Sequence, residues 1–344
     1  MRVFTVILVL GIVGVLIFEH SIAQTTSGES RLGDANLRGI SVAQTHDGDF
    51  VLWATGTKET IIRSLNHGAS WEHETVDGGM NLDFRDVEAF GANTAFIMSS
   101  GDGAASRIFK TIDGGKSWSL QYSDKRPGFF LDSLACSSPT DCFALSDPVE
   151  GKFLVLATRD GEHWKELARD KMPAALPNEG AFAASGTSIA LCGNNIYFGT
   201  GGPAARVFRS ADGGVSWTVA ATPVANGKAS AGIFSVACAG KHVVAVGGDY
   251  KNPDSADRVS AYSDDFGKTW RLAERPPSGY RSAVAVASGG VLSVGPNGED
   301  VSVDYGIHWK AAGSTNLNAV ALTPDGNAWA VGPQGTIKHF AVKF

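Results

Sequence analysis

Charged residues recur at one position of a repeating pattern in this 344-residue chain, and their types suit the binding of an ionic group. Arg38, Arg85, Asp132 and Glu179 follow one another at intervals of 47 residues, and Arg281 stands at the equivalent position further along. Arginine can hold a carboxylate through two parallel hydrogen bonds, whereas a pair of carboxylic acids can work as general acid and base. The set therefore permits recognition of an anionic group or hydrolysis.

Three further acidic residues belong to the same candidate set, because the repeat places them on the same side of the protein. They are Asp86, Asp147 and Asp249. Loops carried by a rigid scaffold are the usual place for binding sites, so we expect a binding surface here. The alternative is that Arg38, Arg85 and Arg281 pair with Asp86, Asp132 and Glu179 only to line a wet channel.

The sequence predicts neither a metal site nor a cofactor. The eight histidines show no H-E-x-x-H or other paired ligand spacing. The chain also has no dinucleotide fingerprint, no C-x-x-C-H haem attachment motif and no G-x-S-x-G nucleophile elbow. We therefore assign no catalytic residue from sequence motifs.

The elements that would position the charged set are predicted by a motif that recurs six times, S/T-x-D-x-G-x-S/T-W, the Asp box. Its short acid accepts hydrogen bonds within a tight turn, its glycine supplies a positive φ, and its tryptophan packs between neighbouring sheets. We therefore give these residues structural roles. They are Asn66 and Trp71, Asp113 and Trp118, Asp160 and Trp164, Asp212 and Trp217, Asp265 and Trp270, and Asp304 and Trp309.

The spacing of the boxes predicts the architecture. Successive tryptophans are 47, 46, 53, 53 and 39 residues apart, which is the length of one four-stranded propeller blade. Three more strand-like segments follow the sixth box, and residues 26–36 can supply their missing fourth strand. We predict an all-β, seven-bladed β-propeller with Asp-box (BNR-like) repeats, whose ring is closed by pairing of the N- and C-terminal strands.

The N-terminus predicts export. Residues 1–23 read as a signal peptide, with an apolar run from Val3 to Phe18 and cleavage after Ala23. The alternative is an uncleaved membrane anchor over residues 3–18, because the run is only slightly shorter than a membrane span. Residues 24–344 would then form a single propeller domain in the periplasm or outside the cell.

An exported protein can form disulfides, so the four cysteines are candidates for disulfide bonds. Cys136 and Cys142 flank a predicted turn between two short strands, and we expect them to form a disulfide. Cys192 and Cys238 lie in different repeats, and the sequence leaves open whether they form a disulfide or remain two buried thiols.

Composition narrows the class of partner. The chain has 29 Lys and Arg residues against 35 Asp and Glu residues, a net charge of −6. This acidic balance argues against nucleic acid as a partner. A membrane contact is expected only through the N-terminal segment if it is not cleaved, and we expect a monomer.

The six boxes and several inner segments resemble the bacterial branch of the photosystem II stability and assembly factor family. The segments that carry the resemblance are 37–42, 83–90, 143–148, 180–186 and 199–202. The resemblance implies a non-enzymatic, exported seven-bladed propeller that binds a protein client or a membrane-protein complex through an arginine-bearing face. Arg38, Arg85 and Arg281 are the residues here that could correspond to those arginines.

A sialidase-like glycoside hydrolase is the alternative function, because such enzymes also carry Asp boxes. Arg38, Arg85 and Arg281 could bind a substrate carboxylate, with Tyr280, Glu179 and Asp132 as nucleophile and acid. However, Leu37-Arg38-Gly39-Ile40 stands where sialidases have F-R-I-P, and seven blades are predicted instead of six. We therefore favour protein binding, by an assembly or stability factor whose client the sequence does not identify.

Overall fold

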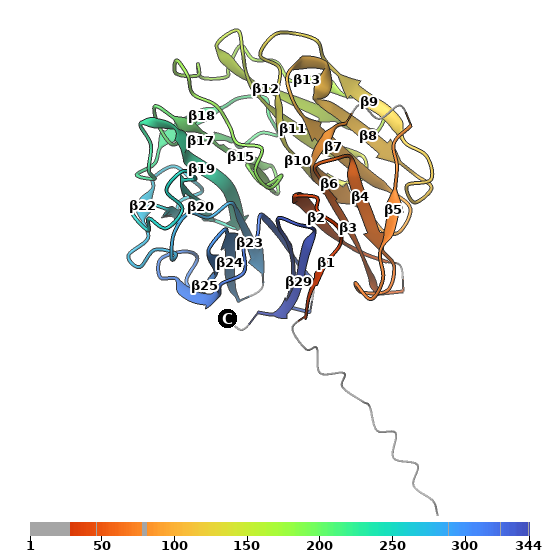
Figure 1. Ribbon diagram of the computed structural model, residues 1–344. Helices are drawn as coiled ribbons and strands as arrows, with labels where there is room; N and C mark the ends of the chain where they lie inside the picture. Colours follow the sequence, from red (N-terminus) through yellow and green to blue (C-terminus); the bar gives the residue numbers. More distant parts are fainter. Residues whose placement is uncertain (1–27, 46, 78–80, 288, 324, 343) are drawn as a thin grey trace, which may run out of the picture.

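Seven antiparallel sheets are arranged in a ring, as the computed structural model of the chain shows (Figure 1). The structure describes residues 28–45, 47–77, 81–287, 289–323, 325–342 and 344. The predicted signal peptide lies outside the described residues. The predicted all-β seven-bladed propeller is confirmed, and within the described ranges the only helical element is one short 3-10 turn, η1 (Gly103–Ala105).

Each blade is a four-stranded meander whose first strand lies nearest the ring axis, and blade 5 gains one additional short strand. Blades 1 to 3 consist of β2 (Leu37–Gln44), β3 (Phe50–Gly56), β4 (Thr60–Ser64) and β5 (Glu72–Glu74); β6 (Asp83–Ala89), β7 (Ala95–Ser100), β8 (Arg107–Thr111) and β9 (Ser119–Ser123); β10 (Leu131–Ser138), β11 (Asp141–Val149), β12 (Lys152–Thr158) and β13 (Lys165–Glu166). Blades 4 and 5 consist of β14 (Ile189–Cys192), β15 (Asn195–Gly199), β17 (Arg206–Ser210) and β18 (Thr218–Ala221); β16 (Gly201–Gly202), β19 (Lys228–Ala239), β20 (His242–Asp249), β21 (Ser260–Ser263) and β22 (Arg271–Leu272). Blades 6 and 7 consist of β23 (Ala283–Ala287), β24 (Gly290–Gly295), β25 (Gly298–Ser302) and β26 (Lys310–Gly313); β27 (Ala319–Leu322), β28 (Asn327–Val331), β29 (Thr336–Ala341) and β1 (Gly28–Arg31).

The two ends of the propeller close the ring together, as the sequence predicts. Strand β1 pairs antiparallel with β29, with Gly28 opposite His339 and Arg31 opposite Thr336. The last blade therefore takes its outer strand from the beginning of the chain. Because the N-terminal strand completes the sheet of blade 7, the first and last blades are held together and the ring has no open gap between them.

The Asp boxes form the turns between the third and fourth strands, and their side chains bond within the turn. In blade 2 the Asp113 carboxylate accepts hydrogen bonds from the Thr111 hydroxyl at 2.8 Å, the Ser117 amide at 3.0 Å and the Ser117 hydroxyl at 2.6 Å. The Gly115 amide donates to the Thr111 hydroxyl at 2.9 Å, with a φ of 87° at Gly115. The predicted structural role of the box is thus visible in its hydrogen bonds.

The box tryptophans lie between neighbouring blades. Trp118 of blade 2 packs edge-on against Trp53 of blade 1, with ring centroids 6.1 Å apart. Trp164 of blade 3 contacts Phe96 of blade 2 in the same way at 5.8 Å. Trp309 of blade 6 is buried in a cluster with Val244 and Val246 of blade 5. Each of these rings therefore joins its own blade to the preceding one, which is how the repeat builds the core.

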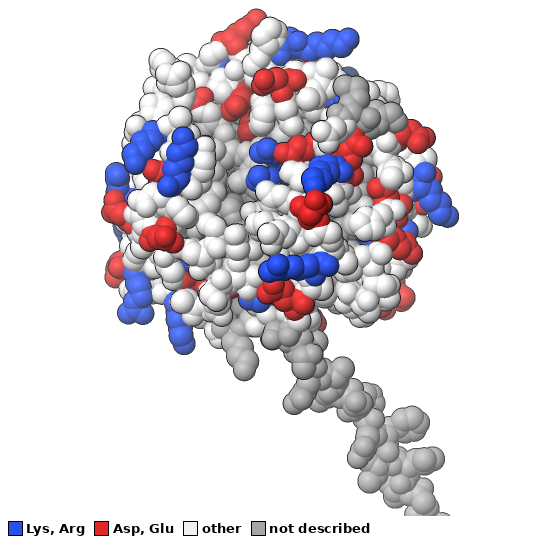
Figure 2. All heavy atoms as spheres, in the orientation of Figure 1, with Lys and Arg blue, Asp and Glu red and all other residues white. Residues whose placement is uncertain are grey.

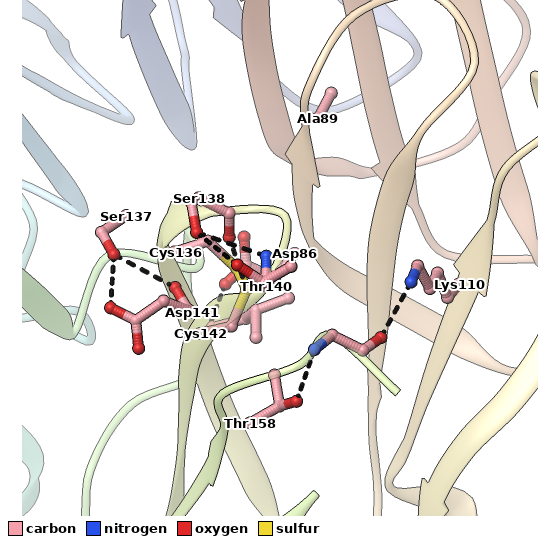
Figure 3. Close-up of a disulfide and its surroundings, with 12 residues drawn as sticks. Asp86, Ala89, Lys110, Cys136, Ser137, Ser138, Thr140, Asp141, Cys142 and Thr158 are labelled. Carbon is pink, nitrogen blue, oxygen red and sulfur yellow. Dashed lines mark hydrogen bonds between the residues drawn. A yellow bond between two sulfur atoms is a disulfide. The ribbon is translucent and has the colours of Figure 1, made fainter. Parts of the chain in front are cut away.

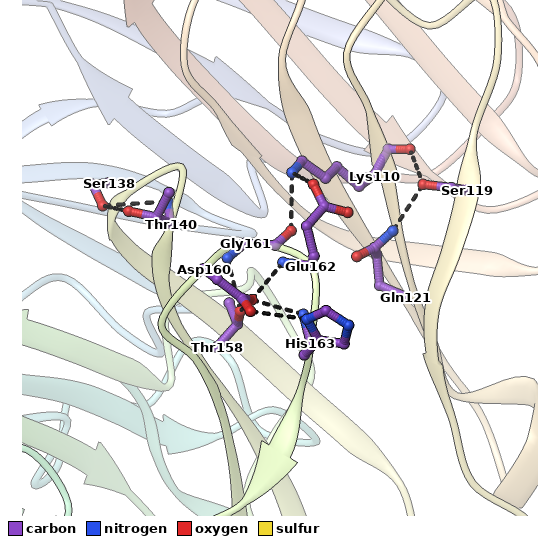
Figure 4. A network of polar contacts seen from close by, with 10 residues as sticks. All are labelled: Lys110, Ser119, Gln121, Ser138, Thr140, Thr158, Asp160, Gly161, Glu162 and His163. Atoms are coloured by element: carbon purple, nitrogen blue, oxygen red, sulfur yellow. Dashed lines mark hydrogen bonds and ion pairs between the residues drawn. The ribbon is translucent and has the colours of Figure 1, made fainter.

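Polar contacts add to this connection between blades. The Lys110 ammonium, on the third strand of blade 2, donates to the Gly161 carbonyl oxygen of the blade 3 box at 2.9 Å and pairs with Glu162 (Figure 4). The Asp160 carboxylate of that box accepts hydrogen bonds from the amides of Glu162 and His163. A box turn is therefore held both from within and from the adjacent blade.

Both cysteine pairs form disulfides. Cys136 and Cys142 stand directly opposite each other on β10 and β11, which confirms the predicted hairpin bridge (Figure 3). Cys192 and Cys238, which the sequence left open, join the inner strands β14 and β19 of blades 4 and 5. All four cysteines are close to the ends of these strands that lead to the Asp-box side of the ring. Within the described residues no helix has the length and apolarity to cross a membrane.

Candidate functional site

The first strands of the blades all begin on the side of the ring opposite the Asp boxes, and a cavity opens there. This side is called the mouth face below, and the side with the box turns is the Asp-box face. The cavity has a volume of about 520 Å³, and Figure 2 shows basic side chains beside the hollow near the centre of the ring. Its lining comes from blades 1 to 6: Arg38, Arg85, Phe130, Asp132, Asp147, Ala181, Phe182, Ala183, Ala184, Ala229, Phe234, Tyr250 and Tyr280.

The two arginines of the cavity differ in their partners. Arg85 forms an ion pair with Asp83 at 2.7 Å and donates a second hydrogen bond to the Ala183 carbonyl oxygen at 2.9 Å. Among the described residues Arg38 forms no direct ion pair and its buried Nε has no hydrogen-bond partner, although the charge of Asp83 acts on it from nearby. Burial, and then the nearby charge of Arg85, lower the pKa of Arg38 below its ordinary value. The Arg38 guanidinium is therefore the cation in the cavity that is most in need of an anionic partner.

The two carboxylates of the cavity are held in surroundings that disfavour their charge. Asp132 is 1% exposed and its Oδ2 has no hydrogen-bond partner in the described part of the chain. Burial, and then the charge of Asp147, raise the pKa of Asp132 well above its ordinary value. Burial also raises the pKa of Asp147 to about 6, although its Oδ1 accepts a hydrogen bond from the Ala181 amide at 2.8 Å.

Aromatic rings form the opposite wall of the cavity. Phe182 and Phe234 are stacked with ring centroids 3.8 Å apart and an interplanar angle of 10°. Tyr280 stands edge-on to Phe234 at 4.8 Å, and Tyr250 does so at 6.1 Å. Burial raises the pKa of the Tyr280 hydroxyl above its ordinary value, so this residue stays neutral. An apolar wall facing arginines suits a ligand that carries both an anionic and an apolar group.

Four of the predicted site residues meet in this cavity: Arg38, Arg85, Asp132 and Asp147. Arg281 does not line it, and its placement corrects the sequence-based expectation. Its side chain is fully buried inside blade 6, where it pairs with Asp300 of β25 and donates to the Tyr280 carbonyl oxygen at 2.9 Å. Arg281 lies just before β23, and its Nε donates to the Asp300 carboxylate at 2.7 Å inside the blade.

Glu179 is also displaced from the cavity. The long segment between β13 and β14 delays the inner strand of blade 4, so Glu179 lies before that strand instead of at its start. Its buried carboxylate pairs with Arg206 and accepts hydrogen bonds from the Thr200 hydroxyl at 2.6 Å and the Leu176 amide at 2.8 Å. Glu179 therefore holds a loop in place.

Asp86 and Asp249 also lie outside the mouth cavity. The Asp86 carboxylate is buried and accepts hydrogen bonds from the amides of Val87 and Leu134, which connects β6 to β10. Asp249 pairs with Lys228 at 2.9 Å beside a separate hollow. Of the pairings in the wet-channel alternative, Arg281 and Glu179 have other partners, Asp300 and Arg206, whereas the charge of Arg85 does act on Asp132.

The sequence reasoning missed most of the aromatic wall, because it considered Tyr280 only as part of a hydrolase site and did not single out Phe182 or Phe234. Phe182, Phe234 and Tyr280 all stand within a few residues of the expected starts of inner strands, in blades 4, 5 and 6. The signal that could have found them is the presence of aromatic residues near equivalent positions of the repeat, alongside the recurring charges.

Comparisons with known proteins bear first on the repeat. Residues 261–272 match the model of the BNR/Asp-box repeat. No curated protein matches the chain. The structure of YCF48 bound to D1 peptide matches with a TM-score of 0.63 and 15% identity, over 92% of this chain and 97% of that one.

The chain shares its fold with YCF48. A second structure, YCF48 from Cyanidioschyzon merolae, matches with a TM-score of 0.62 and 15% identity, over 92% of this chain and 98% of that one. The WD40 propeller domain of Doa1 matches almost as well, with a TM-score of 0.61, 11% identity and coverage of 92% and 96%. The shared fold and the BNR/Asp-box match agree with the resemblance that the Asp boxes indicate. Assignment to the bacterial branch stays a prediction.

Proposed function

We propose that this protein is a non-enzymatic, exported propeller that binds a protein client through the mouth cavity, as an assembly or stability factor. The observation that carries the proposal is the Arg38 guanidinium, which is largely buried in an open cavity, has a buried Nε without a hydrogen-bond partner and shares the nearby carboxylate of Asp83 with Arg85. A buried charge without a partner is unfavourable, and an acidic group of a client would remove that cost. The likeness to YCF48 bound to D1 peptide supports a protein as the client.

Two further observations support parts of this proposal. The two disulfides are typical of proteins in an oxidising compartment outside the cytoplasm. Two of the residues considered for glycoside hydrolysis do not line the cavity, because Glu179 pairs with Arg206 and Arg281 pairs with Asp300. We therefore assign no catalytic residue and no cofactor, and we expect the protein to act as a monomer without nucleic acid.

A photo-cross-linking experiment in the native cell envelope tests the proposal. A photoreactive amino acid at Tyr250, which lines the cavity and is 48% exposed, should give a defined cross-linked protein. Arg38→Glu should abolish that product, because it replaces the unpaired cation by an anion. The recovered client should then bind the purified propeller and bind at least tenfold more weakly to the Arg38→Glu variant.

Two controls keep the result specific. The same photoreactive amino acid at Leu120, 53% exposed on the outer strand of blade 2, should not give this product, and Lys251→Glu should preserve the product formed at Tyr250. A product that persists in Arg38→Glu would overturn binding at the mouth. Turnover of a fluorogenic sialoside or β-glucan by the purified protein would instead establish the hydrolase alternative.

A further inference from the structure

A second hollow adjoins the mouth cavity and extends it outward over blades 3 and 4. It has a volume of about 500 Å³, and its lining residues include Pro148, Ala175, Leu176, Pro177 and Glu179. Asp147 lines both hollows. Asp147 therefore lies at the boundary of two adjacent hollows, which are together called the groove below.

The irregular segment between β13 and β14 builds the outer wall of this groove. This segment has no regular strand over residues 167–188, yet hydrogen bonds hold it against the turn between β11 and β12. The Ala175 amide donates to the Gly151 carbonyl oxygen at 2.9 Å, and the Lys152 ammonium donates to the Arg169 carbonyl oxygen at 2.6 Å. A wall that is fixed before binding lowers the entropic cost of association.

Glu179 completes this support. Its Oε2 accepts from the Leu176 amide at 2.8 Å, and its own amide donates to the Leu176 carbonyl oxygen at 3.0 Å. Arg206 neutralises the buried carboxylate. The acidic residue that the sequence placed in the binding set therefore positions Leu176, which remains 39% exposed at the groove although its side chain is apolar.

The chemistry changes along the groove. At its inner end, Arg38 offers an unpaired cation opposite stacked aromatic rings. At its outer end, the wall is mainly apolar, with Pro148, Leu176 and Pro177. Each hollow is much larger than one side chain, so the pair can take several consecutive residues, which in an extended chain rise about 3.3 Å each.

We propose that the groove binds an extended peptide segment of the client, with an acidic group at Arg38 and a branched aliphatic side chain against Leu176. This inference rests on the proposed function and specifies which features of the client the propeller recognises. Charge complementarity requires an acidic client residue at Arg38, and the apolar wall favours an aliphatic client residue at Leu176. The fixed separation between Arg38 and Leu176 then imposes a fixed spacing between the two client residues.

Selection from a displayed library of random linear peptides tests this proposal on the full propeller. Peptides enriched on the wild-type protein should share an acidic residue and a Leu, Ile or Val at one constant spacing. A fluorescent synthetic peptide with that pattern should bind about tenfold more weakly to Leu176→Ser, because a partly buried leucine contact is lost. Arg38→Gln should weaken its binding by about 10- to 100-fold, as expected for a lost charge-assisted hydrogen bond.

Matched variants and crossed peptides separate the outcomes. Leu120→Ser and Lys251→Gln should leave the affinity unchanged. Replacing the aliphatic peptide residue by serine should remove the effect of Leu176→Ser while preserving that of Arg38→Gln. If Arg38→Gln weakens binding but Leu176→Ser does not, the groove is wrong and binding at the mouth survives. If no peptide is enriched and the cross-linked client is insensitive to Arg38, the proposed function fails as well.

Discussion

The Asp-box face and the mouth face of the same ring treat their carboxylates in opposite ways. At the Asp-box face, the hydroxyl and then the amide of Ser117 donate to Asp113 and lower its pKa to about 2, and Ser216 does the same for Asp212. At the mouth face, burial raises the pKa of Asp147 to about 6. The carboxylates of the Asp-box face thus have hydrogen-bond donors within their own turns, whereas those of the mouth face are buried with few donors. The Asp-box face is therefore suited to stabilise the fold, and the mouth face is suited to bind a ligand.

The disulfides extend this difference. Both Cys136–Cys142 and Cys192–Cys238 lie towards the Asp-box ends of the inner strands. The mouth face has no such cross-link among the described residues, and its walls consist of loops and aromatic rings. We therefore expect changes at the Asp-box side to alter stability and changes at the mouth to alter binding. Three comparisons between variants test this separation.

The largest effect on stability is expected from Trp309→Ala. This ring is 2% exposed between blades 5 and 6, and removing a buried aromatic ring costs about 3–5 kcal/mol. Urea denaturation followed by tryptophan fluorescence and circular dichroism would measure the loss. Val303→Ala, at a 64% exposed residue of the same box, should change stability by less than about 0.5 kcal/mol. Equal effects of the two variants would contradict the interlocking role of the ring.

The two disulfides should differ in their contribution to the free energy of unfolding. The bridge between Cys192 and Cys238 closes a loop with a sequence separation of 46, against 6 for Cys136 and Cys142. The entropic model assigns them about 4 and about 2 kcal/mol. Unfolding of the double serine variants of each pair would measure this order. Peptide binding at the mouth should survive in both variants at urea concentrations where they stay folded, and its loss would show that the two faces are coupled.

The smallest effect, and the one that compares the faces directly, is the pH dependence of Asp132→Asn. Because burial raises the pKa of Asp132, the native state retains a proton that the unfolded chain releases, so stability falls as pH rises above about 4. Asp132→Asn should therefore increase the urea midpoint at pH 8 and leave it nearly unchanged at pH 4. Asp212→Asn should instead lower the urea midpoint at pH 8, because the lowered pKa of Asp212, about 2, stabilises the native state, and this effect should disappear only as the pH falls from about 4 towards 2. The same sign for both variants would contradict the comparison.

The repeat made the fold predictable, because each Asp box specifies a turn and an interblade tryptophan from residues adjacent in sequence. The site was predictable only in part. Arg38 and Asp132 do line the cavity, but the sequence could not show that Arg281 turns into blade 6 towards Asp300, 19 residues away. Glu179 was misplaced because the spacing of 47 residues continues through a blade whose inner strand begins only at Ile189. Side-chain direction and irregular segments depend on tertiary partners that periodicity does not report.

The pairing of β1 with β29 also sets the timing of assembly. Gly28 precedes its partner His339 by almost the length of the propeller. Strand β1 is therefore synthesised long before β29, and the ring cannot close until β29 has been made and has paired with β28. The six preceding blades can form before this pairing, so closure of the ring is a late step of folding.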